Sequence, residues 1–146
     1  MLALIQRVTE AAVRVDDEIV GAIGPGLLAL VAVEPGDGEV QVARMASRLL
    51  GYRVFADAAG RMNLGLADTG GGLLLVSQFT LAADTRSGMR PGFSTAAAPG
   101  TAEPVFNQLL ATCRQKHAAG VETGRFGAHM QVALLNDGPV TFRLET

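Results

Sequence analysis

Residues 73–81 read LLLVSQFTL, and this stretch decides the fold. Its apolar run does not alternate with polar residues, which is the pattern of a strand covered on both faces. We therefore expect a buried central strand over Leu73–Phe79. The chain leaves it for Ala82–Gly100, a segment with two prolines, three glycines and little periodicity. Long irregular segments in compact domains often carry function, so we expect a functional loop there.

Strand patterns surround this segment on both sides. Apolar residues alternate over 2–8, a polar turn at 16–18 joins two short strands into a hairpin ending at residue 23, and an apolar strand covers 27–33. A short strand is expected at 52–55. Downstream, strands at 128–135 and 140–145 flank a turn at 136–139.

Two segments carry helical patterns. The first follows Asp37, a suitable N-cap, and stops at Gly51; the second spans about 102–118, with Pro104 in its first turn and Gly120 just past its end. Together these elements predict one α/β domain over residues 1–146. Its sheet is expected to be mostly antiparallel and barrel-like, with two main helices.

Composition narrows the class of protein. Of the 146 residues, 49% are hydrophobic, yet no apolar run reaches the ~20 residues of a membrane span. The N-terminal segment is interrupted by polar residues and does not read as a signal peptide. We therefore expect a soluble, cytoplasmic protein that does not act at a membrane. The net charge of −2 and the scattered basic residues disfavour binding along a nucleic-acid backbone, but permit a grip on an RNA end.

The cysteine and histidine residues do not indicate a metal site or a catalytic thiol. Cys113 is the only cysteine and lies in a predicted helix, where a buried, inert thiol is expected. His117 and His129 do not have the spacing of metal ligands. We expect neither a metal site nor a cofactor.

Two strings remain, SQFTL at 77–81 and NDGPVT at 136–141. Taken alone, the first could be a strand end whose Phe79 and Leu81 are core. In the second, Asp137-Gly138 is a strong hairpin signal, but Pro139 removes an N–H donor from the strand that follows. Local sequence favours an ordinary trans bond before Pro139.

Together the two strings resemble the signature motifs of the D-aminoacyl-tRNA deacylases. The likeness extends over nearly the whole chain, including LALIQRV at its start, GYRVF at 51–55, LAADTRSGMRP at 81–91 and TGRFGAHMQV at 123–132. The resemblance implies hydrolysis of the ester between a D-amino acid and the tRNA 3′ end. It also implies a homodimer with composite sites, in which a cis Gly138-Pro139 element of one subunit enters the active site of the other and screens chirality through its carbonyl oxygens.

The resemblance also assigns residues. Arg7 would help to hold the Gly138-Pro139 loop across the dimer. The residues expected around the scissile ester and the terminal adenosine are Ser77, Gln78, Phe79 and Thr80, and those expected in the pocket wall are Met130, Phe126, Gly127 and Ala128.

The chain holds no nucleophile motif such as GxSxG. An aminoacyl ester is already activated, so positioning and an oxyanion site suffice, and backbone N–H groups around Phe79–Thr80 are candidates for that site. The resemblance implies help from the 2′-OH of the terminal adenosine; Thr80 as a covalent nucleophile is the rival. A filter that collides with an L side chain should admit glycine, so Gly-tRNA is an expected substrate. Two alternatives stay open: a sister deacylase with a trans Gly-Pro that clears mischarged L-aminoacyl-tRNA, and a non-catalytic dimer that binds RNA ends.

Overall fold

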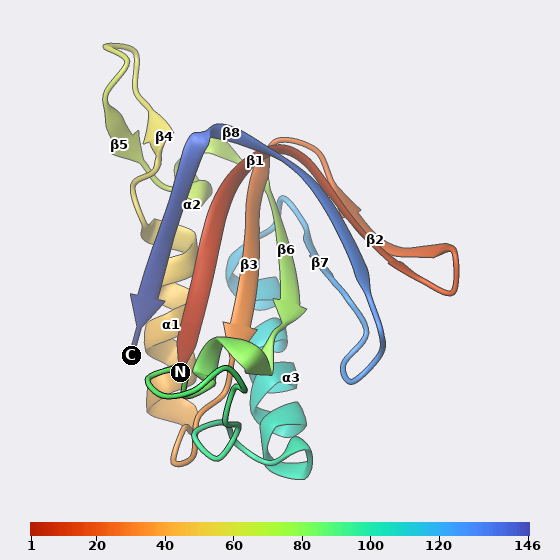
Figure 1. Ribbon diagram of the computed structural model, residues 1–146. Coiled ribbons are helices and arrows are strands. Elements are labelled where there is room, and N and C mark those ends of the chain that lie inside the picture. Colours follow the sequence, from red (N-terminus) through yellow and green to blue (C-terminus); the bar gives the residue numbers. More distant parts are fainter.

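The computed structural model describes residues 1–146. The chain forms one six-stranded sheet and a small two-stranded sheet (Figure 1). In chain order the elements are β1 (Leu2–Val15), β2 (Glu18–Ile23), β3 (Gly26–Ala32), α1 (Glu39–Gly51), β4 (Phe55–Ala56), β5 (Met62–Leu64), α2 (Leu66–Thr69), β6 (Gly72–Ser77), the 3₁₀ helix η1 (Phe79–Ala82), α3 (Pro99–Lys116), β7 (Val121–Thr123) and β8 (Gln131–Glu145).

The long strand β1 organises the main sheet. Its first half pairs with β3 and its second half with β2, while β8 runs antiparallel along its other side. Strands β3, β6 and β7 are parallel. The curved β1 brings β2 back against β7, where a Cβ on Gly21 would lie only 2.4 Å from the Thr123 carbonyl oxygen. Only glycine permits this approach, which closes most of the barrel and confirms the predicted α/β, barrel-like sheet.

The core lies between the sheet and the two main helices, α1 and α3, which pack side by side against one of its faces (Figure 1). Leu27, Leu73 and Leu75 of the parallel strands are fully buried there, as are Leu49 of α1 and Leu109 of α3. Leu74 is equally buried in a second cluster on the other face. Burial on both faces explains the unbroken apolar run of β6, as predicted. No helix of the chain is both long and apolar enough to span a membrane.

Several predicted boundaries are wrong for identifiable reasons. The central strand ends at Ser77, because Phe79 begins η1. Asp37 does not cap α1, whose N-cap is Gly38; the Asp37 carboxylate instead accepts hydrogen bonds from the Met1 ammonium and the Glu34 amide, both at 2.8 Å.

The largest differences concern the two ends of the sheet. The strand predicted at 2–8 and the short strand predicted just before the turn at 16–18 are one continuous β1, and those at 128–135 and 140–145 are one β8 that begins only at Gln131. The predicted strand at 52–55 is reduced to Phe55–Ala56. The short elements β5, α2 and β7 escaped prediction because three or four residues are too few to show a period.

Candidate active site

A pocket of about 550 Å³ opens where β6 ends and η1 begins. Such a volume is ordinary for a small-molecule site. The walls come from β3, the end of β6, η1, the 83–98 segment, α3 and the β7–β8 connection. The lining residues are Val31, Val33, Ser77, Phe79, Phe93, Ala96, Ala97, Ala98, Pro99, Ala102, Phe106, Phe126 and Gly127.

Two aromatic pairs frame the pocket. The rings of Phe79 and Phe93 lie 5.2 Å apart, and those of Phe106 and Phe126 lie 6.0 Å apart. Both distances fall in the range of favourable aromatic contact. Phe79 is 55% exposed, so a large apolar face remains open to a ligand.

Hydrogen bonds fasten the 83–98 segment over the sheet. The Ala97 amide donates to the Val33 carbonyl at 3.0 Å, and the Thr95 hydroxyl donates to the Ala82 carbonyl. At the base of the segment, Arg86 donates to the Asp84 carboxylate at 2.8 and 2.9 Å, which holds the pKa of Asp84 below its usual value. The predicted functional loop is therefore an anchored pocket wall.

Only some residues of the SQFTL string line the pocket. Gln78 continues the sheet by donating its amide to the Val31 carbonyl at 2.7 Å, while its side-chain amide donates to the Thr80 hydroxyl at 2.5 Å. The side chains of Gln78 and Thr80 do not line the pocket, whereas those of Ser77 and Phe79 do. First-turn N–H groups of a helix have no partner within the helix, so the amides of Phe79 and Thr80 can serve an external oxygen.

The pocket wall offers no acid or base: none of its 13 lining residues ionises. The Thr80 hydroxyl has only the Gln78 amide as a side-chain partner. Cys113 is fully buried in the core, where desolvation raises its pKa to about 11. His117 is also buried, with its Nε2 2.7 Å from the Gly71 carbonyl oxygen at the far end of β6.

The Gly138–Pro139 turn lies elsewhere. It leaves β8 between the pairs Val8–Asn136 and Gln6–Thr141, and its peptide bond is cis rather than the trans bond that local sequence favoured. Val8 pairs with Gly26, which is level with the start of β6. The turn and the pocket are thus separated by the length of β6, five residues or about 17 Å.

Arg7 holds the turn of its own chain. Its Nε donates to the Asp137 carbonyl at 3.0 Å and lies 3.1 Å from the Asp137 carboxylate, while its Nη1 donates to the Val54 carbonyl at 2.6 Å. These contacts lie within one chain. That Arg7 also helps to hold the turn across a dimer stays a prediction.

Comparison with known proteins now identifies the family. The model of the family described as D-Tyr-tRNA(Tyr) deacylase matches residues 4–145. The chain belongs to this family. The D-aminoacyl-tRNA deacylase of Xanthomonas euvesicatoria pv. vesicatoria (strain 85-10) is 75% identical over 144 residues, which cover 99% of each chain.

Solved structures agree on the fold. One described as "c-Myc DNA Unwinding Element Binding Protein" superposes with a TM-score of 0.96 at 37% identity and covers 100% of this chain and 99% of its own. Another, described as a "probable eukaryotic D-amino acid tRNA deacylase", reaches a TM-score of 0.83 at 13% identity, with 98% of each chain covered. The second likeness concerns the fold alone.

Within this family member, the structure gathers some predicted site residues and separates others. Ser77, Phe79, Phe126 and Gly127 meet in the pocket. Met130 packs into the second core cluster, Ala128 lies beyond the pocket lining, and the turn residues are at the other end of the sheet.

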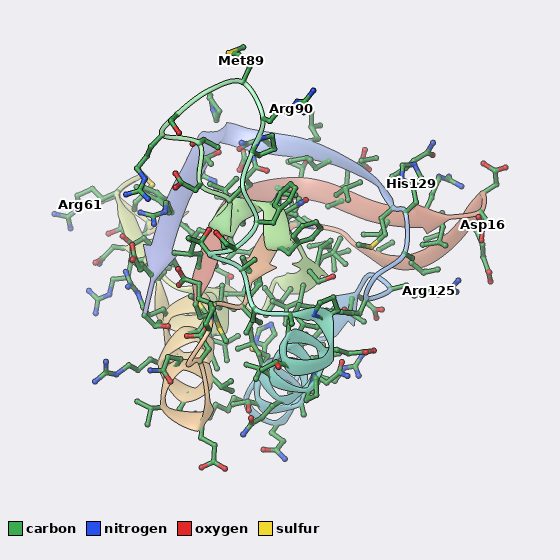
Figure 2. All side chains as sticks on the ribbon, turned by 60° about the horizontal axis from the view of Figure 1, so that its bottom comes forward. Asp16, Arg61, Met89, Arg90, Arg125 and His129 are labelled. Carbon is green, nitrogen blue, oxygen red and sulfur yellow. The ribbon has the colours of Figure 1, made fainter.

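The residues missed are the small and apolar ones that complete the wall. Ala96, Ala97 and Ala98 lie in the segment whose composition predicted a loop, but Phe106 looks like any other core residue of a helix. Arg90 and Arg125 are exposed on the two segments that flank the pocket (Figure 2).

Proposed function

We propose that this chain hydrolyses the ester that joins a D-amino acid to the 3′ end of tRNA, and that it does so in the pocket at the end of β6. The observation that carries the proposal is the pocket itself. In a member of this deacylase family, the start of η1 stands beside an apolar wall without any ionisable group, and first-turn amides have no partner within the helix. Such a site suits an ester that is already activated.

The chemistry follows from these groups. Water adds to the ester carbonyl, and the amides of Phe79 and Thr80 stabilise the oxyanion that forms. The 2′-OH of the terminal adenosine assists, because the wall offers no general base. Collapse of the tetrahedral intermediate releases the 3′-oxygen of the ribose, which takes up a proton, and leaves free tRNA and the D-amino acid. Thr80 needs no covalent role in this scheme.

A homodimer with shared sites is part of the proposal. The Gly138–Pro139 turn and the pocket are about 17 Å apart in one chain, so a single copy cannot bring both to one ester. Strand β8 is an edge strand that pairs only with β1, yet it exposes Leu134, Leu135 and Phe142. Exposed apolar side chains on a long edge strand are typical of an association surface. A second copy covering β8 would carry the turn of one subunit to the pocket of the other.

Chirality would then be screened by shape. The carbonyl oxygens of Gly138–Pro139, brought to the amino acid by the partner, leave room for the hydrogen of a D-residue but not for the Cβ of an L-residue. Glycine has no Cβ, so Gly-tRNA is also expected to be cleaved. Since aminoacyl-tRNA is found in the cytoplasm, the proposed place of action is the cytoplasm.

The test is incubation of the purified chain with D-Tyr-tRNA and L-Tyr-tRNA, with release of tyrosine as the readout. Cleavage of the D-ester alone supports the proposal. Cleavage of the L-ester alone would favour a deacylase for mischarged L-aminoacyl-tRNA, and binding without cleavage would favour a non-catalytic dimer. Light scattering tests the shared site separately: a stable monomer with full activity would disprove it.

A further inference from the structure

The segment around Gly138 lies outside the hydrogen-bond ladder between β1 and β8. Gln6 pairs with Thr141 and Val8 pairs with Asn136, so residues 137–140 of β8 stand opposite the single residue Arg7. Three residues are therefore in excess on the β8 side. Their backbone groups need partners other than the ladder, and the shape of the turn depends on which partners they find.

Asn136 supplies partners at the base of this turn. Its Oδ1 accepts the Val140 amide at 2.9 Å, and its Nδ2 donates to the Thr141 hydroxyl oxygen at 2.9 Å. The same hydroxyl oxygen accepts a hydrogen bond from the Gln6 side-chain amide at 3.3 Å. One side chain thus spans the excess residues and, through Thr141, is tied back to β1.

The effect reaches Gly138 through Val140. Gly138 has φ +144°, and a Cβ at that position would lie 2.5 Å from Cγ2 of Val140 and 2.7 Å from its amide nitrogen. Val140 also packs against the main core cluster. Because Oδ1 of the Asn136 side chain accepts the Val140 amide, it holds in place the Val140 atoms that lie against Gly138.

The other side of the turn is held by Arg7 through Asp137. Gly138 and Pro139 are exposed and have no polar side chain of their own. The positions of their carbonyl groups therefore depend on the residues on either side of the turn. Arg7 fixes the entrance to the turn and Asn136 fixes its exit.

We infer that Asn136, with Thr141 as its partner, is a positioning residue for the discrimination between D- and L-aminoacyl esters. This inference rests on the proposed function. Asn136 does not line the pocket proposed for the ester, so its loss should spare the rate on the D-ester. Without the Asn136 hydrogen bonds, the turn can move to make room for an L side chain. Cleavage of the L-ester should therefore rise.

The experiment compares Asn136→Ala and Thr141→Val with two controls, in the full chain. Thr141→Ser keeps the hydroxyl that Asn136 and Gln6 use. Gln131→Ala removes an exposed amide from the same strand, where no hydrogen bond is made by that side chain. The first readout is the ratio of rates on D-Tyr-tRNA and L-Tyr-tRNA. It should fall about tenfold in Asn136→Ala, the factor that corresponds to one lost hydrogen bond. The fall in Thr141→Val should be smaller, and both controls should keep the wild-type ratio.

The ratio separates positioning from a purely structural role. A variant that merely folds less well loses both rates in proportion, and an unchanged ratio in Asn136→Ala would overturn the inference. The second readout is hydrogen exchange at the Val140 amide, which should be protected in wild type and faster in Asn136→Ala. Equal exchange in the two would show that the hydrogen bond does not hold the turn.

The two readouts also separate this inference from the proposed function. A wild-type chain that cleaves neither ester would overturn the proposed function and, with it, the role of Asn136 in discrimination. The exchange measurement needs no substrate, so in that case it would still decide whether Asn136 fixes the turn.

Discussion

Replacing Ala102 with leucine should make the protein more stable and less active. Ala102 lies on α3, is only 7% exposed and lines the pocket at the end of β6. A larger side chain there would extend into about 550 Å³ of open space rather than into packed atoms. It therefore escapes the usual cost of overpacking a core. Leucine is also a good helix former, so α3 should tolerate it.

The size of the effect follows from the added atoms. Leucine has three more carbons than alanine, and each buried methylene contributes about 0.8 kcal/mol, so the gain in unfolding free energy is at most about 2.4 kcal/mol. Part of the side chain will stay in contact with solvent through the pocket mouth, which makes about 1 kcal/mol the expected value. The same carbons occupy the space proposed for substrate, so cleavage of D-Tyr-tRNA should fall by an order of magnitude or more.

Urea unfolding and single-turnover deacylation measure the two effects. Ala111→Leu is the matched control, because Ala111 is exposed on the same helix away from the pocket. It should change neither stability nor rate by much. Wild-type activity in a stable, folded Ala102→Leu protein would refute the assignment of this pocket to the substrate.

Three further predictions concern chemistry and titration. Thr80→Ala should keep most of its activity, while tRNA ending in 2′-deoxyadenosine should be cleaved far more slowly; an acyl-enzyme trapped on Thr80 would contradict both. Gly-tRNA should be cleaved measurably while L-Ala-tRNA is spared in the same time course, and equal resistance would argue for direct recognition of the D side chain. Burial raises the pKa of Cys113 from 9.0 to about 11, so the folded state favours the neutral thiol. Stability should therefore be lost as the pH rises above about 9, and Cys113→Ala should remove that part of the loss in pH-dependent urea unfolding.

The sequence correctly predicts those features of the fold that are determined within a single helix or strand. The unbroken apolar run of β6 predicts its burial, and the periodicity of α1 and α3 predicts both helices. It fails at β8, where Asp137-Gly138 gives a genuine local hairpin signal. The structure instead keeps one strand, because the residues on both sides of the turn pair with β1 and not with each other, while Arg7 and Asn136 hold the turn between them. Those contacts join positions that sequence patterns treat independently.

The same reasoning explains which parts of the site could be predicted. Ser77 and Phe79 stand in a recognisable string at a strand end, but Val33, Phe93 and Ala102 become neighbours only when the 83–98 segment folds over β3 and α3. Nothing in their local sequence distinguishes them from core or loop residues.

Because the pocket and the turn lie apart in the chain, we expect them to have separate roles in the proposed reaction. The pocket has an apolar wall and no ionisable group, and it is where we propose that the ester is hydrolysed. The turn lies about 17 Å away along β6 and holds the carbonyl groups proposed to distinguish the two enantiomers. Changes at the pocket should therefore alter the rates on both enantiomers together. Changes at Arg7 or Asn136, which hold the turn, should instead alter the ratio of the two rates.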